Sequence, residues 1–175
     1  MTFADLQLNQ RIQSILSTQG FDTPTAIQAE AIPVILGNHD VLASAQTGTG
    51  KTAAFALPIL HSLELSASRG ALKALILAPT RELALQTYES MQQWNAGSDL
   101  HMAVIYGGVP YETQIDALGK NPDVIVATPG RLIDLWEQGH ISFADLMYFV
   151  LDEVDQMLDL GFQEAIALLA KQKPE

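Results

Sequence analysis

Short apolar runs alternate with longer amphipathic stretches along the whole chain, and this alternation limits the possible folds. The runs are nearly free of polar residues, as in strands buried on both faces of a parallel sheet. Strands that alternate with helices form right-handed βαβ units, which predicts an α/β fold with a mostly parallel sheet between helices. We predict strands at Val41–Ala45, Leu72–Ala78, Met102–Tyr106, Val124–Ala127 and Met147–Leu151, and helices at Asn9–Thr18, Thr25–Leu36, Lys51–Leu65, Arg81–Trp94, Tyr111–Leu118, Leu132–Gln138 and Glu153–Lys171, the last interrupted near Leu160-Gly161.

Length and composition exclude several classes of protein. A chain of 175 residues fits one domain. The net charge of −11 excludes a basic tail, so any contact with nucleic acid must come from a few placed groups. The absence of cysteine excludes disulfides, iron–sulfur clusters and a cysteine nucleophile.

The remaining compositional features predict an ordinary cytoplasmic protein. The sequence has no apolar run of about 18 residues and no secretory signal, so we expect no membrane segment and a cytoplasmic location. Trp94 and Trp136 lie on amphipathic stretches and are expected in the core. The histidines lack the spacing of metal ligands, and no zinc site is expected at His39, His61, His101 or His140.

A glycine-rich segment follows the first apolar run and precedes a helical pattern. Gly48 and Gly50 let the backbone approach a polyphosphate, and the start of the helix adds a positive dipole end. Lys51 can reach the outer phosphates, and the Thr52 hydroxyl can bind Mg²⁺. The strict phosphate-loop pattern has glycine where this chain has Ala45, so a plain connecting turn is the alternative.

An acidic pair follows the last apolar run. Asp152 at the end of a buried strand can hold Mg²⁺ through water, and Glu153 can orient the attacking water. Acidic residues are also ordinary at the start of a helix, where they complement the dipole. The combination of a phosphate grip with a metal-binding carboxylate favours nucleotide hydrolysis.

The order of short motifs along the chain resembles that of the DEAD-box RNA helicases. The resemblance rests on residues 20–28, which are similar to the family's Q motif, and on Ala45–Thr52, Pro79–Ala84, Gly107-Gly108, Thr128–Arg131 and Asp152–Asp155. It implies the N-terminal RecA-like domain, a three-layer P-loop NTPase sandwich, in a Q-motif region at 1–36 and an ATP-binding part at 37–175, packed as one domain. In that family Ala45 is the ordinary residue at the head of the phosphate loop.

The resemblance implies ATP and Mg²⁺ as cofactors. Gln28 has the donor and acceptor that suit adenine. The implied catalytic residues are Lys51, Thr52, Asp152 and Glu153, with Mg²⁺ held by Thr52 and Asp152, largely through water. The implied nucleotide-binding residues are Phe3, Phe21, Thr23, Gln28, Ala45, Gln46, Thr47, Gly48, Thr49, Gly50, Lys51 and Thr52.

The resemblance also implies an RNA-binding surface. Exposed N–H groups at strand-to-helix junctions, with nearby arginines, can hold phosphates without reading the base sequence, although helix capping alone is the alternative for each junction. The implied partners are RNA and a second RecA-like domain; the oligomeric state stays open. The implied RNA-binding residues are Pro79, Thr80, Arg81, Gly107, Gly108, Thr128, Pro129, Gly130 and Arg131.

The sequence departs from the family pattern in two ways. Val154 stands where the family has alanine, which adds volume without removing a carboxylate. The family's Ser-Ala-Thr strand and arginine-bearing second domain do not occur before Glu175, so we expect an incomplete sheet, a marginal fold, and negligible hydrolysis by these residues alone. Two alternatives remain: a module that binds RNA or a regulator without catalysis, and a DNA-translocating helicase.

Overall fold

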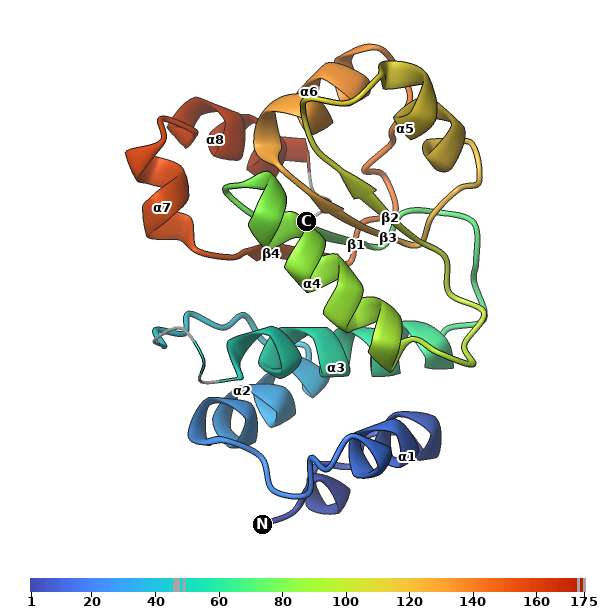
Figure 1. Ribbon diagram of the computed structural model, residues 1–175, viewed down its shortest axis with the longest axis vertical. Coiled ribbons are helices and arrows are strands. Elements are labelled where there is room, and N and C mark those ends of the chain that lie inside the picture. The colour runs from blue at the N-terminus through green and yellow to red at the C-terminus, as the bar shows by residue number, and fades with distance from the viewer. Residues whose placement is uncertain (46–47, 49, 173, 175) are drawn as a thin grey trace. The chain divides into compact units, whose positions relative to one another are not determined.

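The chain folds into two compact units. A computed structural model describes residues 1–45, 48, 50–172 and 174. We call Met1–Ala67 with Ser90–Asp99 the N-terminal unit, and Ser68–Glu89 with Leu100–Glu175 the sheet unit. Helix α4 (Arg81–Trp94) begins in the sheet unit and ends in the N-terminal unit (Figure 1). The division into 1–36 and 37–175 stays a prediction.

The helices of the N-terminal unit begin at capping residues. The Asn9 side chain accepts a hydrogen bond from the Ile12 N–H (2.9 Å), and Thr25 shares a reciprocal capping box with Gln28. These caps satisfy backbone donors that a helix start leaves unpaired. The predicted helices are confirmed within a residue at each end as α1 (Gln10–Thr18), α2 (Ala26–Leu36) and α3 (Lys51–Leu65), and a short 3₁₀ helix, η1 (Phe3–Leu6), precedes them.

A charged cluster joins three segments of the N-terminal unit. The Arg11 guanidinium makes two parallel bonds to the Glu64 carboxylate, at 2.6 and 2.7 Å. Its Nη1 also donates to the carbonyls of Trp94 and Ala96, at the end of α4. Asn9 donates through its side chain to Glu64 (2.7 Å) and through its backbone N–H to His61 Nδ1 (2.9 Å). The start of α1, the last turns of α3 and the end of α4 are therefore held together by polar contacts.

Acidification is expected to destabilise this cluster. Burial opposes the ionised form of Glu64, yet the bonds from Arg11 and Asn9 hold its pKa below the ordinary 4.5. The contribution of Glu64 is therefore present above about pH 4.5 and is lost as the pH falls through its lowered folded-state pKa. We expect Glu64→Gln to be less stable than the unaltered protein at neutral pH, with the difference in Tm shrinking as the pH falls below 4.5. A difference that grows on acidification would contradict this assignment.

The predicted strand at Val41–Ala45 is wrong. Val41 is 41% exposed, Leu42 is fully exposed, and the segment has no strand assignment. A strand exists only through hydrogen bonds to a neighbouring strand, and among the described residues none pairs with this run. Apolar composition predicts that a segment can be a strand but carries no information about whether a neighbour is present.

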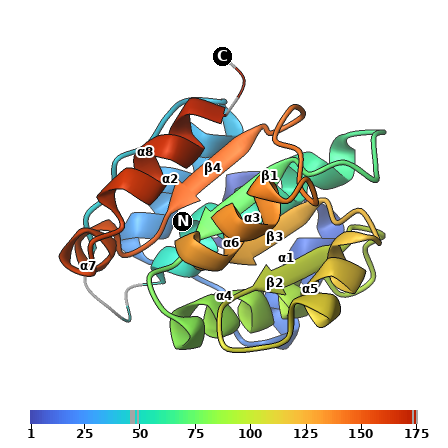
Figure 2. The same cartoon turned by 90° about the horizontal axis from the view of Figure 1, so that it is seen from above.

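The sheet unit is built on a parallel sheet. In the described residues it has four strands in the order β2-β3-β1-β4, shown in Figure 2. Ala74 of β1 lies opposite Val124 of β3 and Tyr148 of β4. Parallel neighbours need crossover connections, and the helices between the strands supply them. The strands are β1 (Ala74–Leu77), β2 (Met102–Ile105), β3 (Val124–Ala127) and β4 (Tyr148–Leu151).

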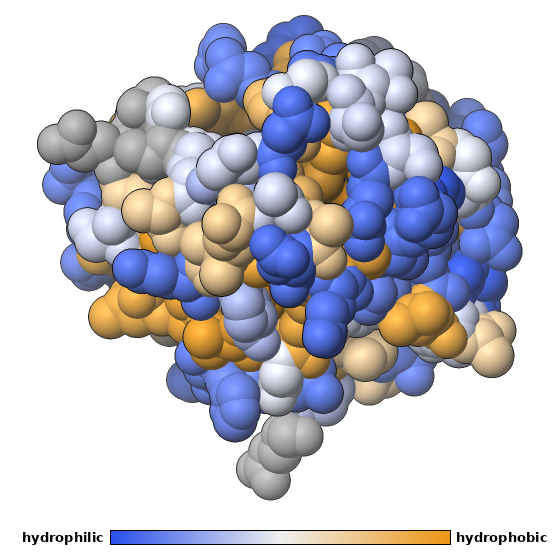
Figure 3. Space-filling view, turned by 90° about the horizontal axis from the view of Figure 1, so that it is seen from below, coloured by the Kyte–Doolittle hydropathy of each residue, from blue (hydrophilic) through white to orange (hydrophobic). Residues whose placement is uncertain are grey.

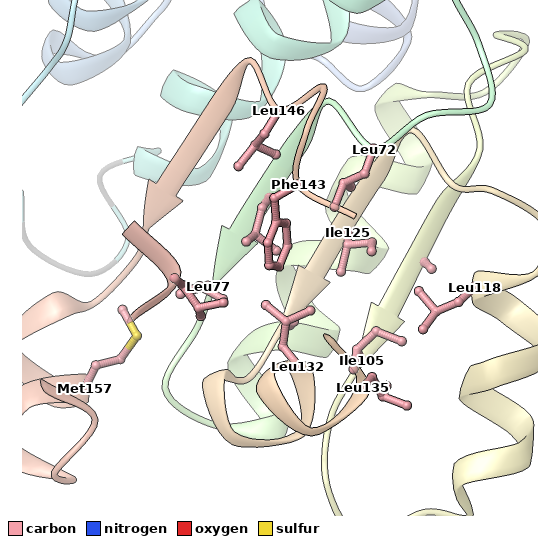
Figure 4. Close-up of a cluster of buried hydrophobic side chains, with 14 residues drawn as sticks. Leu72, Leu77, Ile105, Leu118, Ile125, Leu132, Leu135, Phe143, Leu146 and Met157 are labelled. Atoms are coloured by element: carbon pink, nitrogen blue, oxygen red, sulfur yellow. The ribbon is translucent and has the colours of Figure 1, made fainter. Parts of the chain in front are cut away.

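Helices of the sheet unit cover one face of the sheet. Leu77, Ile105 and Ile125 from the strands pack with Leu132 and other apolar side chains in one buried cluster (Figure 4). Phe143 and the half-buried Trp136 pack with this cluster as well. The helices are α5 (Tyr111–Leu118), α6 (Pro129–Glu137), α7 (Val154–Asp159) and α8 (Gln163–Gln172).

Two helix boundaries test the sequence predictions. The stretch from Glu153 to Lys171 is two helices separated at residues 160–162, as predicted. Helix α6 begins at Pro129, three residues before its predicted start at Leu132. Proline is favoured in the first helical turn because its fixed φ suits the helix and its missing N–H needs no partner there.

Strand β4 is an end strand of the sheet. The residues of β1 and β3 are all buried, whereas all four residues of β4 are only half-buried. β4 pairs with β1 on one side, and no other strand of the described residues pairs with it. The prediction of an incomplete sheet is confirmed; the predicted marginal stability stays a prediction.

Apolar and polar side chains share the surface. Figure 3 shows hydrophilic and hydrophobic residues interspersed over the face that it draws. Large exposed apolar side chains include Phe21 at 51% and Leu65 at 70%. None of the described helices is long and apolar enough to cross a membrane.

Candidate functional site

The carboxyl ends of the four strands place four sequence motifs along one edge of the sheet. Gly107-Gly108 follows β2, Thr128 follows β3, Pro79-Thr80 follows β1, and Asp152 follows β4. Because the strands are parallel and ordered β2-β3-β1-β4, the motifs line this edge in that same order. Ligands of open parallel sheets bind at this edge. The three motifs predicted to bind RNA are therefore neighbours, and the acidic motif lies at the end.

The acidic motif combines a buried carboxylate with an unusual backbone. Asp152 is 7% exposed, and its N–H donates to the Leu77 carbonyl (2.9 Å), which fixes it beside β1. Glu153 has φ +53° and ψ +49°, in the left-handed region that disfavours side chains. Such a conformation costs about 1 to 2 kcal/mol, and Gln7, Asn38 and Asn121 adopt it as well.

The phosphate-loop segment lies in the N-terminal unit, where α3 begins at Lys51. Gly48 (φ +87°) and Gly50 (φ +82°) both adopt the left-handed conformation that glycine tolerates. The first turn of α3 has no acidic residue, so it carries the positive end of the helix dipole together with the Lys51 ammonium. Gln46, Thr47 and Thr49 were predicted as loop residues and lie outside the described residues.

Gln28 ties the Q motif to this loop. Its Nε2 donates to the Gly50 carbonyl (3.1 Å), and its Oε1 accepts from the Thr25 N–H (3.0 Å). A Cβ added at Gly50 would lie within 3.0 Å of the Gln28 side-chain amide and 3.1 Å from Thr25 Oγ1. Gly50 is therefore fixed both by its conformation and by the approach of Gln28. These two bonds leave one amide hydrogen and one lone pair of Gln28 for the predicted adenine contact, which stays a prediction.

The other predicted adenine residues differ in exposure. Phe3 is 5% exposed and its N–H donates to the Asp22 carbonyl (3.2 Å), so it anchors the start of the chain. Phe21 is 51% exposed, and Thr23 is also exposed. Phe3, Phe21 and Asp22 border an open hollow of about 520 Å³. The two phenylalanines thus border one hollow, and their contact with adenine stays a prediction.

The motif after β1 meets the motif after β2. Thr80 Oγ1 accepts from the Leu83 N–H (3.3 Å) and caps α4. The Arg81 guanidinium lies over the Tyr106 ring, 4.7 Å from its centroid. A Cβ added at Gly108 would lie 3.9 Å from Arg81 Nη1. Arg81 is exposed, so a cationic group borders the two exposed glycines.

The motif after β3 also contacts the segment that follows β2. Arg131 Nη1 donates to the Val109 carbonyl (2.9 Å) and to Gln114 Oε1 (3.0 Å). Its guanidinium lies 4.0 Å from the centroid of the Tyr111 ring. Thr128 occupies the position before α6, and Pro129 its first position, although the Thr128 side chain makes no capping bond.

Residues 25–175 match the family described as DEAD/DEAH box helicase. The chain belongs to this family. RNA helicase CrhR of Synechocystis is 43% identical over 173 residues, which cover 99% of this chain and 35% of that protein. ATP-dependent RNA helicase DeaD of Escherichia coli is 45% identical over 177 residues, covering 99% of this chain and 28% of that protein. The DEAD/DEAH box chain thus spans about a third of the length of these relatives.

A solved structure supports the fold of this DEAD/DEAH box chain. The crystal structure of a DEAD box protein from the hyperthermophile Methanococcus jannaschii has a TM-score of 0.91 and 36% identity to it. The similarity covers 99% of this chain and 47% of that one. The predicted family and RecA-like α/β fold are confirmed.

Sequence reasoning missed three residues of this DEAD/DEAH box chain that shape the motif edge. Tyr106 and Tyr111 carry the rings beneath Arg81 and Arg131, and Gln114 bonds to both neighbouring motifs. Gln114 is 4% exposed, so it is a polar residue on the buried side of α5. A polar residue at an apolar helical position was the available signal for it.

The two tryptophans predicted for the core are packed there. Trp94 is 8% exposed, and Trp136 packs against the sheet-unit cluster. Among the described residues no group of three or more His, Cys, Asp or Glu side chains is arranged to hold a metal ion.

Proposed function

We propose that this chain is the N-terminal ATP- and RNA-binding domain of a DEAD-box RNA helicase. The complete protein would couple ATP binding and hydrolysis to the unwinding or remodelling of RNA duplexes, with a second RecA-like domain completing the site. The observation that carries the proposal is the order of motifs along the carboxyl edge of the sheet, together with the family membership. Cytoplasmic location stays a prediction of the sequence.

The nucleotide part of the proposal rests on the N-terminal unit. Lys51 and Thr52 open α3 after two glycines in the left-handed conformation, so the helix dipole and the Lys51 ammonium place positive charge at this end of the loop. Gln28 fixes the loop through the Gly50 carbonyl. Phe3, Phe21, Thr23 and the whole segment from Ala45 to Thr52 are the proposed nucleotide-binding residues.

We propose Mg²⁺ with ATP, held by Thr52 and Asp152, largely through water. A hydroxyl and a carboxylate are oxygen donors of the kind that this ion prefers, directly or through its bound waters. The ion would supply charge neutralisation at the phosphates. Glu153, turned by its left-handed backbone, would accept a hydrogen bond from the attacking water and orient it.

The RNA part of the proposal rests on three adjacent strand ends. Arg81 and Arg131 supply two positive charges. Gly107 and Gly108 have no side chains, so the RNA strand can approach the protein backbone there. Pro79, Thr80, Thr128, Pro129 and Gly130 complete the proposed surface. Contacts of this kind bind phosphates and carry no base information, so we expect binding that does not depend on sequence.

ATP hydrolysis by the complete product of the gene, measured with and without single-stranded RNA, tests this proposal. We expect RNA to stimulate turnover severalfold or more, with matched DNA stimulating less. RNA binding with no hydrolysis and no nucleotide effect would favour the passive module instead. Equal stimulation by RNA and DNA would favour a DNA-translocating helicase.

A further inference from the structure

The Gly107-Gly108 turn is held at both of its flanks by hydrogen bonds to backbone carbonyls. On one flank, Gln114 Nε2 donates to the Tyr106 carbonyl (2.8 Å). On the other flank, Arg131 Nη1 donates to the Val109 carbonyl (2.9 Å). The glycines themselves are exposed, and nothing lies within 4 Å of a Cβ added at Gly107. Their side-chain-free surface is thus open while the residues on either side are fixed.

Gln114 connects the two flanks. Its Oε1 accepts from the same Arg131 nitrogen that bonds to Val109, at 3.0 Å. The side-chain amide of Gln114 therefore binds both segments: its N–H donates to Tyr106 before the glycine turn, and its oxygen accepts from Arg131 in the motif after β3. It is 4% exposed, so water does not compete freely for these bonds.

Arg131 is oriented from a second direction by Tyr111. The ring lies under the guanidinium at 4.0 Å, and the Tyr111 hydroxyl donates to Asp134 Oδ2 (2.9 Å). Tyr111 and Gln114 both belong to α5, whereas Arg131 and Asp134 both belong to α6. A guanidinium has five donors, and the Nη1 bonds leave Nε and Nη2 for a phosphate.

We propose that Gln114 is a positioning residue for RNA binding, acting through Arg131 and the Gly107-Gly108 turn. This inference rests on the proposed function, because it names how the RNA surface is held in its binding conformation. A surface fixed before binding loses less conformational freedom when the strand arrives, which improves affinity without an added contact. Gln114 has no charge and little exposed surface, so it gains no phosphate contact of its own.

A double-mutant cycle on the complete protein tests the inference. RNA affinity is measured by fluorescence anisotropy with labelled single-stranded RNA and a non-hydrolysable ATP analogue. We expect Gln114→Ala to weaken RNA binding about tenfold, as for a lost buried hydrogen-bond pair. In an Arg131→Gln background, the same substitution is expected to cost clearly less than about tenfold, since only its bond to the Tyr106 carbonyl remains to be lost. Affinity for the ATP analogue without RNA is expected to stay unchanged.

Thr113→Ala is the matched control, since Thr113 is exposed on the same helix. If Gln114→Ala does not fold, Gln114→Glu replaces it: the carboxylate still accepts from Arg131 but cannot donate to the Tyr106 carbonyl, and we expect a weaker loss of affinity. Unchanged RNA affinity in a folded Gln114 variant, or additive losses in the cycle, would overturn the inference. Failure of the unaltered protein to bind RNA would instead overturn the proposed function.

Discussion

Lys51→Ala is expected to reduce RNA-stimulated ATP hydrolysis by the complete protein about 100-fold or more. Lys51 is the first residue of α3, directly after Gly50, where the helix dipole and the ammonium add at one place. In the proposed site this charge faces the phosphates, whose negative charge is redistributed in the transition state. The loss is measured as kcat with saturating RNA.

Lys120→Ala is the control for this experiment. Lys120 is an exposed lysine in the turn after α5, outside every motif, and removing it changes the net charge by the same amount. We expect its kcat to match that of the unaltered protein. If Lys51→Ala kept more than about half of the activity, the phosphate-loop assignment would be wrong.

Gly50→Ala is expected to cost both stability and nucleotide affinity. The residue has φ +82°, and an added Cβ would be too close to the Gln28 side chain for any real contact. The substitution therefore adds a steric conflict to the backbone strain of about 1 to 2 kcal/mol. We expect a lower Tm and an affinity for ATP at least about tenfold weaker, because the Gln28 bond to the loop must break.

Gly139→Ala separates the backbone strain from the steric conflict with Gln28. Gly139 has nearly the same backbone angle, φ +86°, with nothing within 4 Å of an added Cβ. It should show the strain alone and normal ATP affinity. Adding Gln28→Ala to Gly50→Ala should recover part of the lost stability, since the conflicting side chain is removed. Equal Tm values and normal ATP affinity for Gly50→Ala and Gly139→Ala would contradict the role of Gln28.

The helices and the strand ends could be predicted because their signals are local. Asn9 and Thr25 mark helix starts because each side chain pairs with backbone donors within one turn. Apolar runs marked β1 to β4, and parallel pairing then places the motifs that follow them on one edge. The prediction of a strand at Val41–Ala45 was wrong because pairing with another strand depends on residues far away in the sequence.

The polar contacts that hold the site were beyond sequence reasoning for the same reason. Gln114 meets Arg131 across two helices, and Gln28 meets Gly50 across a separation of 22 residues. Side-chain spacing along one element contains no information about such pairs. Only the assembled chain shows that Gln28 and Gln114, both buried amides, each join one motif to another.

Thermodynamic coupling between nucleotide and RNA is the most direct measure of the proposed function. Affinity for a magnesium-bound, non-hydrolysable ATP analogue would be determined by calorimetry on the complete protein, with and without saturating single-stranded RNA. We expect RNA to tighten nucleotide binding about tenfold or more, and the nucleotide to tighten RNA binding by the same factor, because such coupling is reciprocal. Identical nucleotide affinities in the presence and absence of bound RNA would contradict the proposal.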